Sequence, residues 1–112
     1  MGEFAVEIDS TLSAIDHVFR ISDNALSRAE KLVRCVQLAA AAFVYFLEIH
    51  PFANGNGHMA RLFLIATMRR RGFFLSKWTL DPRPQDPPYT GAIEAYRSGN
   101  RTPLEKFILS CL

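Results

Sequence analysis

Apolar side chains recur every three or four residues between Ala25 and Ile49, and this spacing predicts one long helix. Its first half keeps a polar face, but beyond Cys35 apolar residues occupy a second face as well. A helix that is apolar nearly all round is expected to run through the core of a domain. Pro51 disfavours helical backbone at the residue before it, so this helix should stop at His50.

A second helix is predicted from Gly57 to Arg71, with Gly72 as the residue of positive φ that closes it. Its apolar residues at helical spacing are expected to face inward. These residues are Met59, Leu62, Phe63, Ala66 and Met68. The run Arg69 to Arg71 falls where the dipole of a helix C-terminus favours cations, and we interpret it as a solvated helix end.

Two shorter helices are predicted near the C-terminus. One runs from Tyr89 to Arg97 and is closed by Gly99. The other runs from Thr102 to Leu112 and begins with a capping box between Thr102 and Glu105, with Pro103 at the first helical position.

The segments between these helices are less regular. Phe4 to Asp9 alternates apolar and polar residues, which favours a short strand or hairpin. A helix beginning at Asp9 or Ser10 should follow and should be broken at Ser22 to Asn24. Asp81 to Pro88 is proline-rich and predicts a loop. We therefore expect an all-α compact helical bundle, with residues 1–112 as a single domain or the truncated core of one.

Composition supports a folded domain and narrows its partners. The chain has 112 residues, of which 49% are hydrophobic and 12% aromatic, and this indicates a compact globule with one core. Thirteen basic residues are nearly matched by eleven acidic ones, giving a formal charge of +2. That charge is too small to make nucleic acid the expected main partner.

Cysteine usage and hydropathy bear on the compartment. Cys35 and Cys111 lie in apolar helical patterns without metal-ligand spacing, so we expect buried free thiols in a reducing environment. The N-terminus lacks the basic and apolar regions of a signal peptide. The nearly uncharged stretch from Cys35 to Leu47 is expected to be too short to span a bilayer. A cytoplasmic protein with no membrane partner is therefore expected.

Candidate chemistry is concentrated between the two main helices. His50 can exchange a proton near neutral pH. Asn54 to Gly57 can adopt positive φ and present consecutive backbone N–H groups, which form an anion-binding nest. The helix that follows directs its positive dipole end at the same place, and Arg61 adds a cation one turn later. A base, a phosphate-binding loop and a cation are predicted to converge.

The segment that carries these residues, HPFANGNGHMAR, resembles the signature of the Fic (Fido) family, H-x-F-x-[D/E]-G-N-G-R-x-x-R. The matching residues are His50, Phe52, Gly55, Asn56, Gly57 and Arg61. A long apolar helix before the motif, a helix after it and the C-terminal helices also agree with the family pattern.

The resemblance implies an all-α enzyme that binds ATP and transfers AMP to a Ser, Thr or Tyr hydroxyl of a target protein. It implies that His50 is the general base for that hydroxyl and that Phe52 is a buried plug for the loop. It further implies that Gly55 to Gly57 bind the phosphates, and that Arg61 neutralises their charge.

Two positions depart from the family signature. Asn54 replaces the acidic residue that holds Mg²⁺, and a neutral oxygen is a poorer ligand for this hard cation, so weak Mg²⁺ binding is expected. His58 replaces an arginine and lacks its bidentate fork, so it is expected either to contact a phosphate or to lie in solvent. Slow, altered or absent activity is therefore one of the expected outcomes.

Three functions remain open on the sequence. They are a nucleotidyl transferase, a related Fic chemistry such as removal of AMP or transfer of another phosphorylated group, and a catalytically degenerate module that binds a nucleotide or a protein. The resemblance also allows an inhibitory, antitoxin-like partner. Thr90 to Glu94 only approaches the family's inhibitory motif, because Ala95 follows it, and the ordinary C-terminal helix is the favoured reading.

The remaining candidates have simpler interpretations. A zinc pair of His50 and His58 lacks a third ligand at useful spacing, because His17 is remote and is expected at the surface. Trp78 and Tyr89 could stack on a nucleotide base, but core packing is the favoured prediction.

Overall fold

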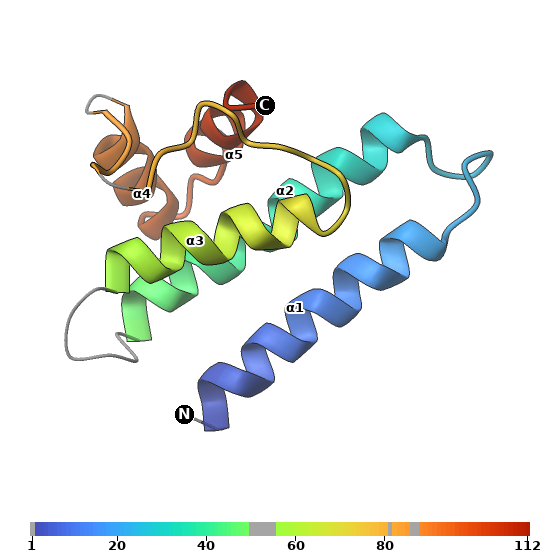
Figure 1. The fold of residues 1–112 in the computed structure, drawn as a ribbon, viewed down its shortest axis with the longest axis horizontal. Helices are drawn as coiled ribbons and strands as arrows, with labels where there is room; N and C mark the ends of the chain where they lie inside the picture. Colours follow the sequence, from blue (N-terminus) through green and yellow to red (C-terminus); the bar gives the residue numbers. More distant parts are fainter. Residues whose placement is uncertain (1, 50–55, 81, 86–87) are drawn as a thin grey trace.

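The computed structural model describes residues 2–49, 56–80, 82–85 and 88–112, with side chains from residue 6 in the first helix and from residue 57 in the third. Within these residues the chain forms five α-helices and no strand (Figure 1). The helices are α1 (Gly2–Arg20), α2 (Arg28–Ile49), α3 (Asn56–Arg69), α4 (Tyr89–Arg97) and α5 (Thr102–Ser110). The predicted all-α bundle is confirmed.

Helix α2 is the centre of the bundle. It packs against α1 and α3 along its length and also contacts α4 and α5, which pack on one another (Figure 1). Val36, Ala39, Ala40 and Phe43 form one face and are at most 1% exposed, and Ala42, Val44 and Phe46 on other sides are at most 6% exposed, so most of its circumference is covered in this half. The prediction of a buried central helix is confirmed.

The nearly uncharged stretch from Cys35 to Leu47 lies within a longer apolar helix. At 22 residues, α2 as a whole is long enough and apolar enough to cross a membrane. In this structure the same apolar residues form the core of the bundle.

The N-terminal segment is helical, so the predicted strand at Phe4 to Asp9 is wrong. Helix α1 begins at Gly2 and continues without a break to Arg20. The alternation at residues 4–9 is short, and Ile8 also lies one helical turn before Leu12, which continues the apolar spacing of the following residues. The same positions therefore satisfy a helix that can pack on α2, whereas no neighbouring strand is present among the described residues.

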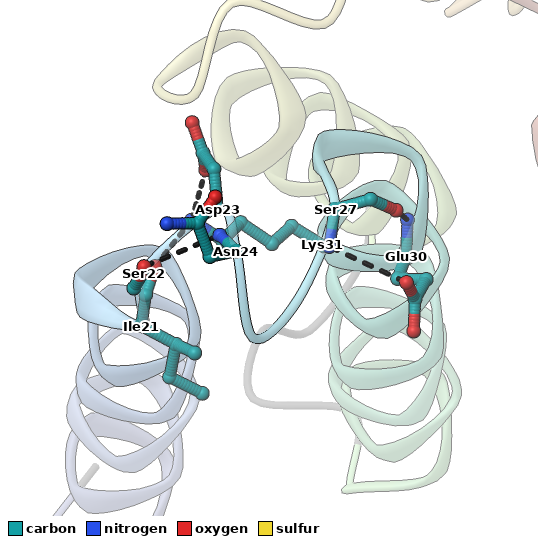
Figure 2. Close-up of polar contacts among 7 residues, drawn as sticks. All are labelled: Ile21, Ser22, Asp23, Asn24, Ser27, Glu30 and Lys31. Atoms are coloured by element: carbon teal, nitrogen blue, oxygen red, sulfur yellow. Dashed lines mark hydrogen bonds and ion pairs between the residues drawn. The ribbon is translucent and has the colours of Figure 1, made fainter.

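The connection between α1 and α2 is fixed by polar contacts (Figure 2). Ser27 and Glu30 form a capping box, because each side chain accepts a hydrogen bond from the other residue's backbone N–H, at 3.2 and 3.3 Å. This box starts α2 at Arg28, three residues later than predicted. Lys31 is 4% exposed, and its ammonium donates to the Ile21 carbonyl oxygen and to a carboxylate oxygen of Asp23.

Helix α3 is closed as predicted but presents a different face to the core. The N–H of Gly72, with φ 84°, bonds to the Arg69 carbonyl, and the N–H of Phe73 bonds to Met68, which is a Schellman motif. Met59 and Leu62 are each 39% exposed, so their predicted inward position is wrong.

Apolar residues surround α3 nearly completely, so spacing alone defines two possible inward stripes. The side chains that pack inward are Ala60, Leu64, Thr67 and Met68. Ala66 is exposed and Phe63 is half-buried, so Met68 is the one residue of the predicted stripe that is fully buried. Ala60 is small, and we infer that it lets α3 approach α2 closely, which favours this stripe.

Helix α4 has the predicted bounds, and Gly99 at φ 99° closes it with a second Schellman motif. The predicted capping box of α5 is absent. Arg101 is the N-cap residue, it makes no side-chain cap, and the N–H of Thr102 bonds instead to the Asn100 side chain at 3.3 Å. Thr102 lies inside the helix, where its side chain is one position too late to cap.

Aromatic residues join the C-terminal helices to α2. Trp78 and Tyr89 are 4% and 3% exposed, and both rings pack edge-on against Phe43, with centroids 5.6 and 6.5 Å away. Core packing of these two residues is therefore confirmed. The cysteines are also buried as free thiols, as predicted.

Candidate functional site

The first turn of α3 brings a glycine and an arginine together. A Cβ atom added to Gly57 would lie 3.0 Å from a terminal nitrogen of the Arg61 guanidinium. The absence of a side chain at Gly57 therefore lets the guanidinium lie against the start of the helix. Backbone N–H groups in the first turn of a helix lack intrahelical partners and attract anions. The cation and these N–H groups consequently face the same space.

Arg61 is anchored on both its side chain and its backbone. Its Nε donates a hydrogen bond of 2.9 Å to the carbonyl oxygen of Leu80, and its own carbonyl accepts a bond of 3.3 Å from the indole N–H of Trp78. Because Trp78 belongs to the buried core, the position of Arg61 is tied to the core. The bond to Leu80 uses Nε, and the guanidinium carries further donors on its two terminal nitrogens for an anionic ligand.

A cavity of about 210 Å³ lies beside Gly57 and Arg61. It is formed between the C-terminal end of α2, the start of α3, the proline-rich loop and α4. The lining residues are Leu47, Gly57, Arg61, Arg83, Tyr89, Thr90, Ile93, Glu94 and Arg97. Three arginines against one glutamate make this cavity suited to an anion.

Several predicted site residues lie outside the described residues. These are His50, Phe52, Asn54 and Gly55, and the side chain of Asn56 is also undescribed. The backbone of Asn56 begins α3, so the predicted helix start beside the loop is confirmed. The convergence of His50 with the phosphate-binding residues stays a prediction.

His58 does not join Arg61 at the cavity. It is exposed in the first turn of α3 and does not line the cavity, although the two residues are three positions apart. A contact between His58 and a phosphate stays a prediction.

Arg83 and the cavity-lining face of α4 were missed by sequence reasoning. Thr90, Ile93, Glu94 and Arg97 follow helical spacing on one side of α4, so a search for one polar-edged face of the predicted helix could have found them. Arg97 also donates to Glu48 of α2 at 3.0 Å, which holds this wall of the cavity to the central helix.

The described residues offer no additional candidate for a metal site. Among residues 2–49, 56–80, 82–85 and 88–112, no three His, Cys, Asp or Glu side chains are grouped as they would be around a metal ion. His17 is exposed on α1.

Comparison with known proteins identifies related sequences. A model of the Fic/DOC family matches residues 2–68. The chain is 36% identical over 52 residues to the protein adenylyltransferase Fic of Nematostella vectensis, which covers 46% of this chain and 12% of that protein. It is 30% identical over 76 residues to proteins of the same name from Drosophila virilis and Drosophila melanogaster, which covers 68% of this chain and 15% of theirs. No solved structure matches the chain.

Proposed function

The chain belongs to the Fic/DOC family, and from this membership we propose that it transfers AMP from ATP to a hydroxyl side chain of a target protein. The observation that carries the proposal is Arg61, which is fixed over Gly57 at a helix start and beside a cavity lined by further arginines. A fixed cation at a helix N-terminus is suited to the phosphates of a nucleotide. The chain spans 12 to 15% of the length of these Fic relatives.

The proposed reaction needs a base and a site for developing negative charge. His50 takes the proton of the target hydroxyl, and the hydroxyl oxygen forms a bond to the α-phosphorus of ATP. The bond from that phosphorus to the bridging oxygen breaks, and pyrophosphate leaves with the electron pair. Arg61 and the first-turn N–H groups of α3 stabilise the charge on the phosphates during this transfer.

The size of the cavity sets how the nucleotide would bind. At about 210 Å³ it is smaller than the 300–1,000 Å³ typical of sites for whole drug-sized ligands. We therefore propose that it holds one part of the nucleotide. The rest would lie over residues 50–55, which belong to the motif but lie outside the described residues.

Mg²⁺ would neutralise part of the phosphate charge when bound. At the motif position that holds Mg²⁺ in the family signature, this chain offers the neutral amide oxygen of Asn54, and no three acidic or metal-ligating side chains gather among the described residues. These donors fit a weak site in which the nucleotide phosphates supply most of the ligands.

A second candidate function is favoured by Asn54 and His58. Both positions carry less charge than the family signature, and His58 is exposed and does not line the cavity. A domain that binds nucleotide without transferring it would show these changes. Related reactions, such as removing AMP or transferring another phosphorylated group, would use the same base and phosphate site.

The test is incorporation of label from ATP labelled in the α-phosphate, with Mg²⁺ or Mn²⁺ and candidate target proteins. We expect label on a protein hydroxyl, and His50→Ala and Arg61→Ala should abolish it. Arg69→Ala is the matched control, because Arg69 lies on α3 but does not line the cavity. A parallel assay uses ATP labelled in the γ-phosphate. Incorporation of the γ label without the α label would indicate phosphoryl transfer instead.

A second test restores the charged residues of the family signature at positions 54 and 58. Asn54→Asp should tighten Mg²⁺, and His58→Arg should add a bidentate phosphate contact, so the double variant should transfer AMP at least about tenfold faster. Adding His50→Ala should remove the gain. Nucleotide binding by calorimetry together with inactivity of the double variant would support the binding module and refute the transferase.

A further inference from the structure

A second concave region lies on a different side of α2 from the candidate site. This groove, of about 480 Å³, is formed by α1, α2 and the turn before α5. Its apolar lining residues are Ala14 and Val18 from α1 and Leu38 and Ala41 from α2, and Gln37 lies among them. It shares no residue with the cavity beside Arg61, so a role for the groove is independent of the proposed function.

The rim of the groove is basic. His17, Arg34 and Arg101 come from three different elements, and all three are exposed. No Asp or Glu lines the groove within the part of the chain that the structure describes. The whole chain has a net charge of only +2, so the groove concentrates positive charge that is balanced elsewhere.

Arg34 differs from the arginines that hold the fold together. Arg70, Arg71 and Arg97 each form an ion pair with a carboxylate on another helix. Arg34 forms no ion pair with any residue that the structure describes. Its charge is therefore available to a partner.

The shape and charge of the groove together specify an occupant. We propose that it docks an acidic amphipathic helix of a partner protein. The small side chains of Ala14 and Ala41 let a third helix approach the α1–α2 pair closely. Arg34 and Ala41 both line the groove and are exposed, and their seven-residue separation along α2 corresponds to about 10.5 Å, or two turns of a docked helix.

In this arrangement the apolar face of the incoming helix covers Leu38 and Ala41. Its acidic residues flank that face and lie opposite Arg34 and Arg101, which fixes its orientation. Charge complementarity of this kind gives specificity and weakens as salt screens it.

The experiment uses two designed peptides of fifteen residues with the same Leu and Ala face. One carries Glu on its flanks and the other carries Lys, and binding of each fluorescent peptide to the full chain is followed by anisotropy. We expect the Glu peptide to bind at least about tenfold more tightly and to weaken with added salt. Equal binding of the two peptides, or binding by neither, would overturn the proposal.

Reversing the charge of the groove arginines tests whether they determine the preference between the two peptides. Arg34→Glu with Arg101→Glu should invert the preference, so that the Lys peptide binds more tightly than the Glu peptide. Arg69→Glu with Lys77→Glu makes the same charge change on α3 and in the loop after it, which contribute nothing to the groove, and should preserve the original preference. Both groove positions are exposed, and an unchanged circular dichroism spectrum would show that the fold persists.

Filling the groove separates docking from general attraction to charge. Ala41→Trp should abolish binding of the Glu peptide while Arg34 and Arg101 remain. Decanoate tests the alternative of a small anionic amphiphile. If decanoate binds in an Arg34-dependent manner and the Glu peptide does not bind, the groove takes a small ligand and the proposal is wrong.

Discussion

The position of the Arg61 side chain depends on the absence of a side chain at Gly57. Its guanidinium lies where a Cβ on Gly57 would be 3.0 Å away, and its Nε is held by Leu80. A glycine in a helical first turn lowers helix propensity, by about 1 kcal/mol relative to alanine in a helix interior. At Gly57 that cost coincides with the close approach of the cation.

Gly57→Ala should therefore separate stability from ligand binding. The added methyl group should push the flexible guanidinium away, and nucleotide affinity should fall about tenfold, as for loss of one hydrogen bond to a charged group. Thermal stability should stay level or rise, because alanine is the better helix former. Calorimetry and thermal denaturation measure the two effects, and unchanged affinity would remove this contact from the site.

Asp16 should make stability depend on pH in the acid range. Side-chain hydrogen bonds from Arg70 and then Arg71 lower the pKa of Asp16 from 3.8 to about 2. A lowered pKa means that the stabilisation is complete above about pH 4 and is lost as pH falls through about 2. Arg70 and Arg71 are therefore more than the solvated helix end that we predicted, because both pair with Asp16.

Asp16→Asn should lower the melting temperature at pH 7, and the difference from wild type should disappear near pH 2. Denaturation followed by circular dichroism from pH 2 to 7 measures this. Asp9→Asn, on the same helix and exposed, is the control and should have a smaller effect. A deficit that is constant over the whole pH range would contradict the ion-pair explanation.

The two thiols should be unreactive in the folded protein. Burial raises the pKa of Cys35 to about 11 and also raises the pKa of Cys111. Very little thiolate is then present at pH 8, and access is blocked as well. Ellman's reagent should react slowly with the native protein and rapidly with both thiols in guanidinium chloride. Fast reaction in the native state would show that one of them is accessible.

At the scale of elements, glycine position decides whether a substitution helps or harms α4. Gly91 lies inside the helix with nothing within 4 Å of an added Cβ, whereas Gly99 closes the helix at φ 99°. Gly91→Ala should raise stability by about 0.5–1 kcal/mol. Gly99→Ala should lower it by about 1–2 kcal/mol, because a side chain is disfavoured at positive φ. Urea denaturation of both variants checks the prediction, and effects of the same sign would refute it.

The ends of the helices show what local sequence can predict. Gly72 and Gly99 were identified correctly, because a glycine after an apolar periodic run has few other uses. Thr102 and Glu105 have the spacing of a capping box but do not form one, while Ser27 and Glu30 have the same spacing and do. The spacing alone does not distinguish them, since tertiary packing determines which residue precedes the first helical turn.

The orientation of α3 could not be predicted from periodicity. Both stripes of α3 are apolar, so the choice depends on the surface that α2 presents. The prediction of an N-terminal strand was wrong for a similar reason. Over so few residues, Phe4 to Asp9 is compatible with the period of a strand or of a helix. In each case the information lies in a partner element far away in the sequence.

At the scale of the whole molecule, the phosphate-binding residues of the motif were easier to predict than the other residues that line the cavity. The motif placed Gly57 and Arg61 together correctly because they lie one turn apart. Arg83 and Arg97 were missed, since they reach the same cavity only through the tertiary arrangement of the loop and α4. Sequence could supply the phosphate-binding turn, whereas the rest of the cavity required the fold.

The hydrophobic core connects the central helix to the candidate site through Phe43. Phe43 is fully buried and contacts Trp78 and Tyr89, of which the first bonds to the Arg61 backbone and the second lines the cavity. Phe43→Ala should therefore cost about 3–5 kcal/mol of unfolding free energy. That loss is a large part of the 5–15 kcal/mol typical of a domain.

Phe74→Ala is the matched control for this substitution. Phe74 is 59% exposed, so its removal should change the free energy of unfolding by less than about 1 kcal/mol. Guanidinium denaturation of both variants gives the comparison. In conditions where Phe43→Ala remains folded, its nucleotide affinity should also fall, because Trp78 and Tyr89 lose the ring that holds them beside Arg61. If both variants were equally stable, α2 would not be the centre of the core, and the link from core to site would have no physical basis.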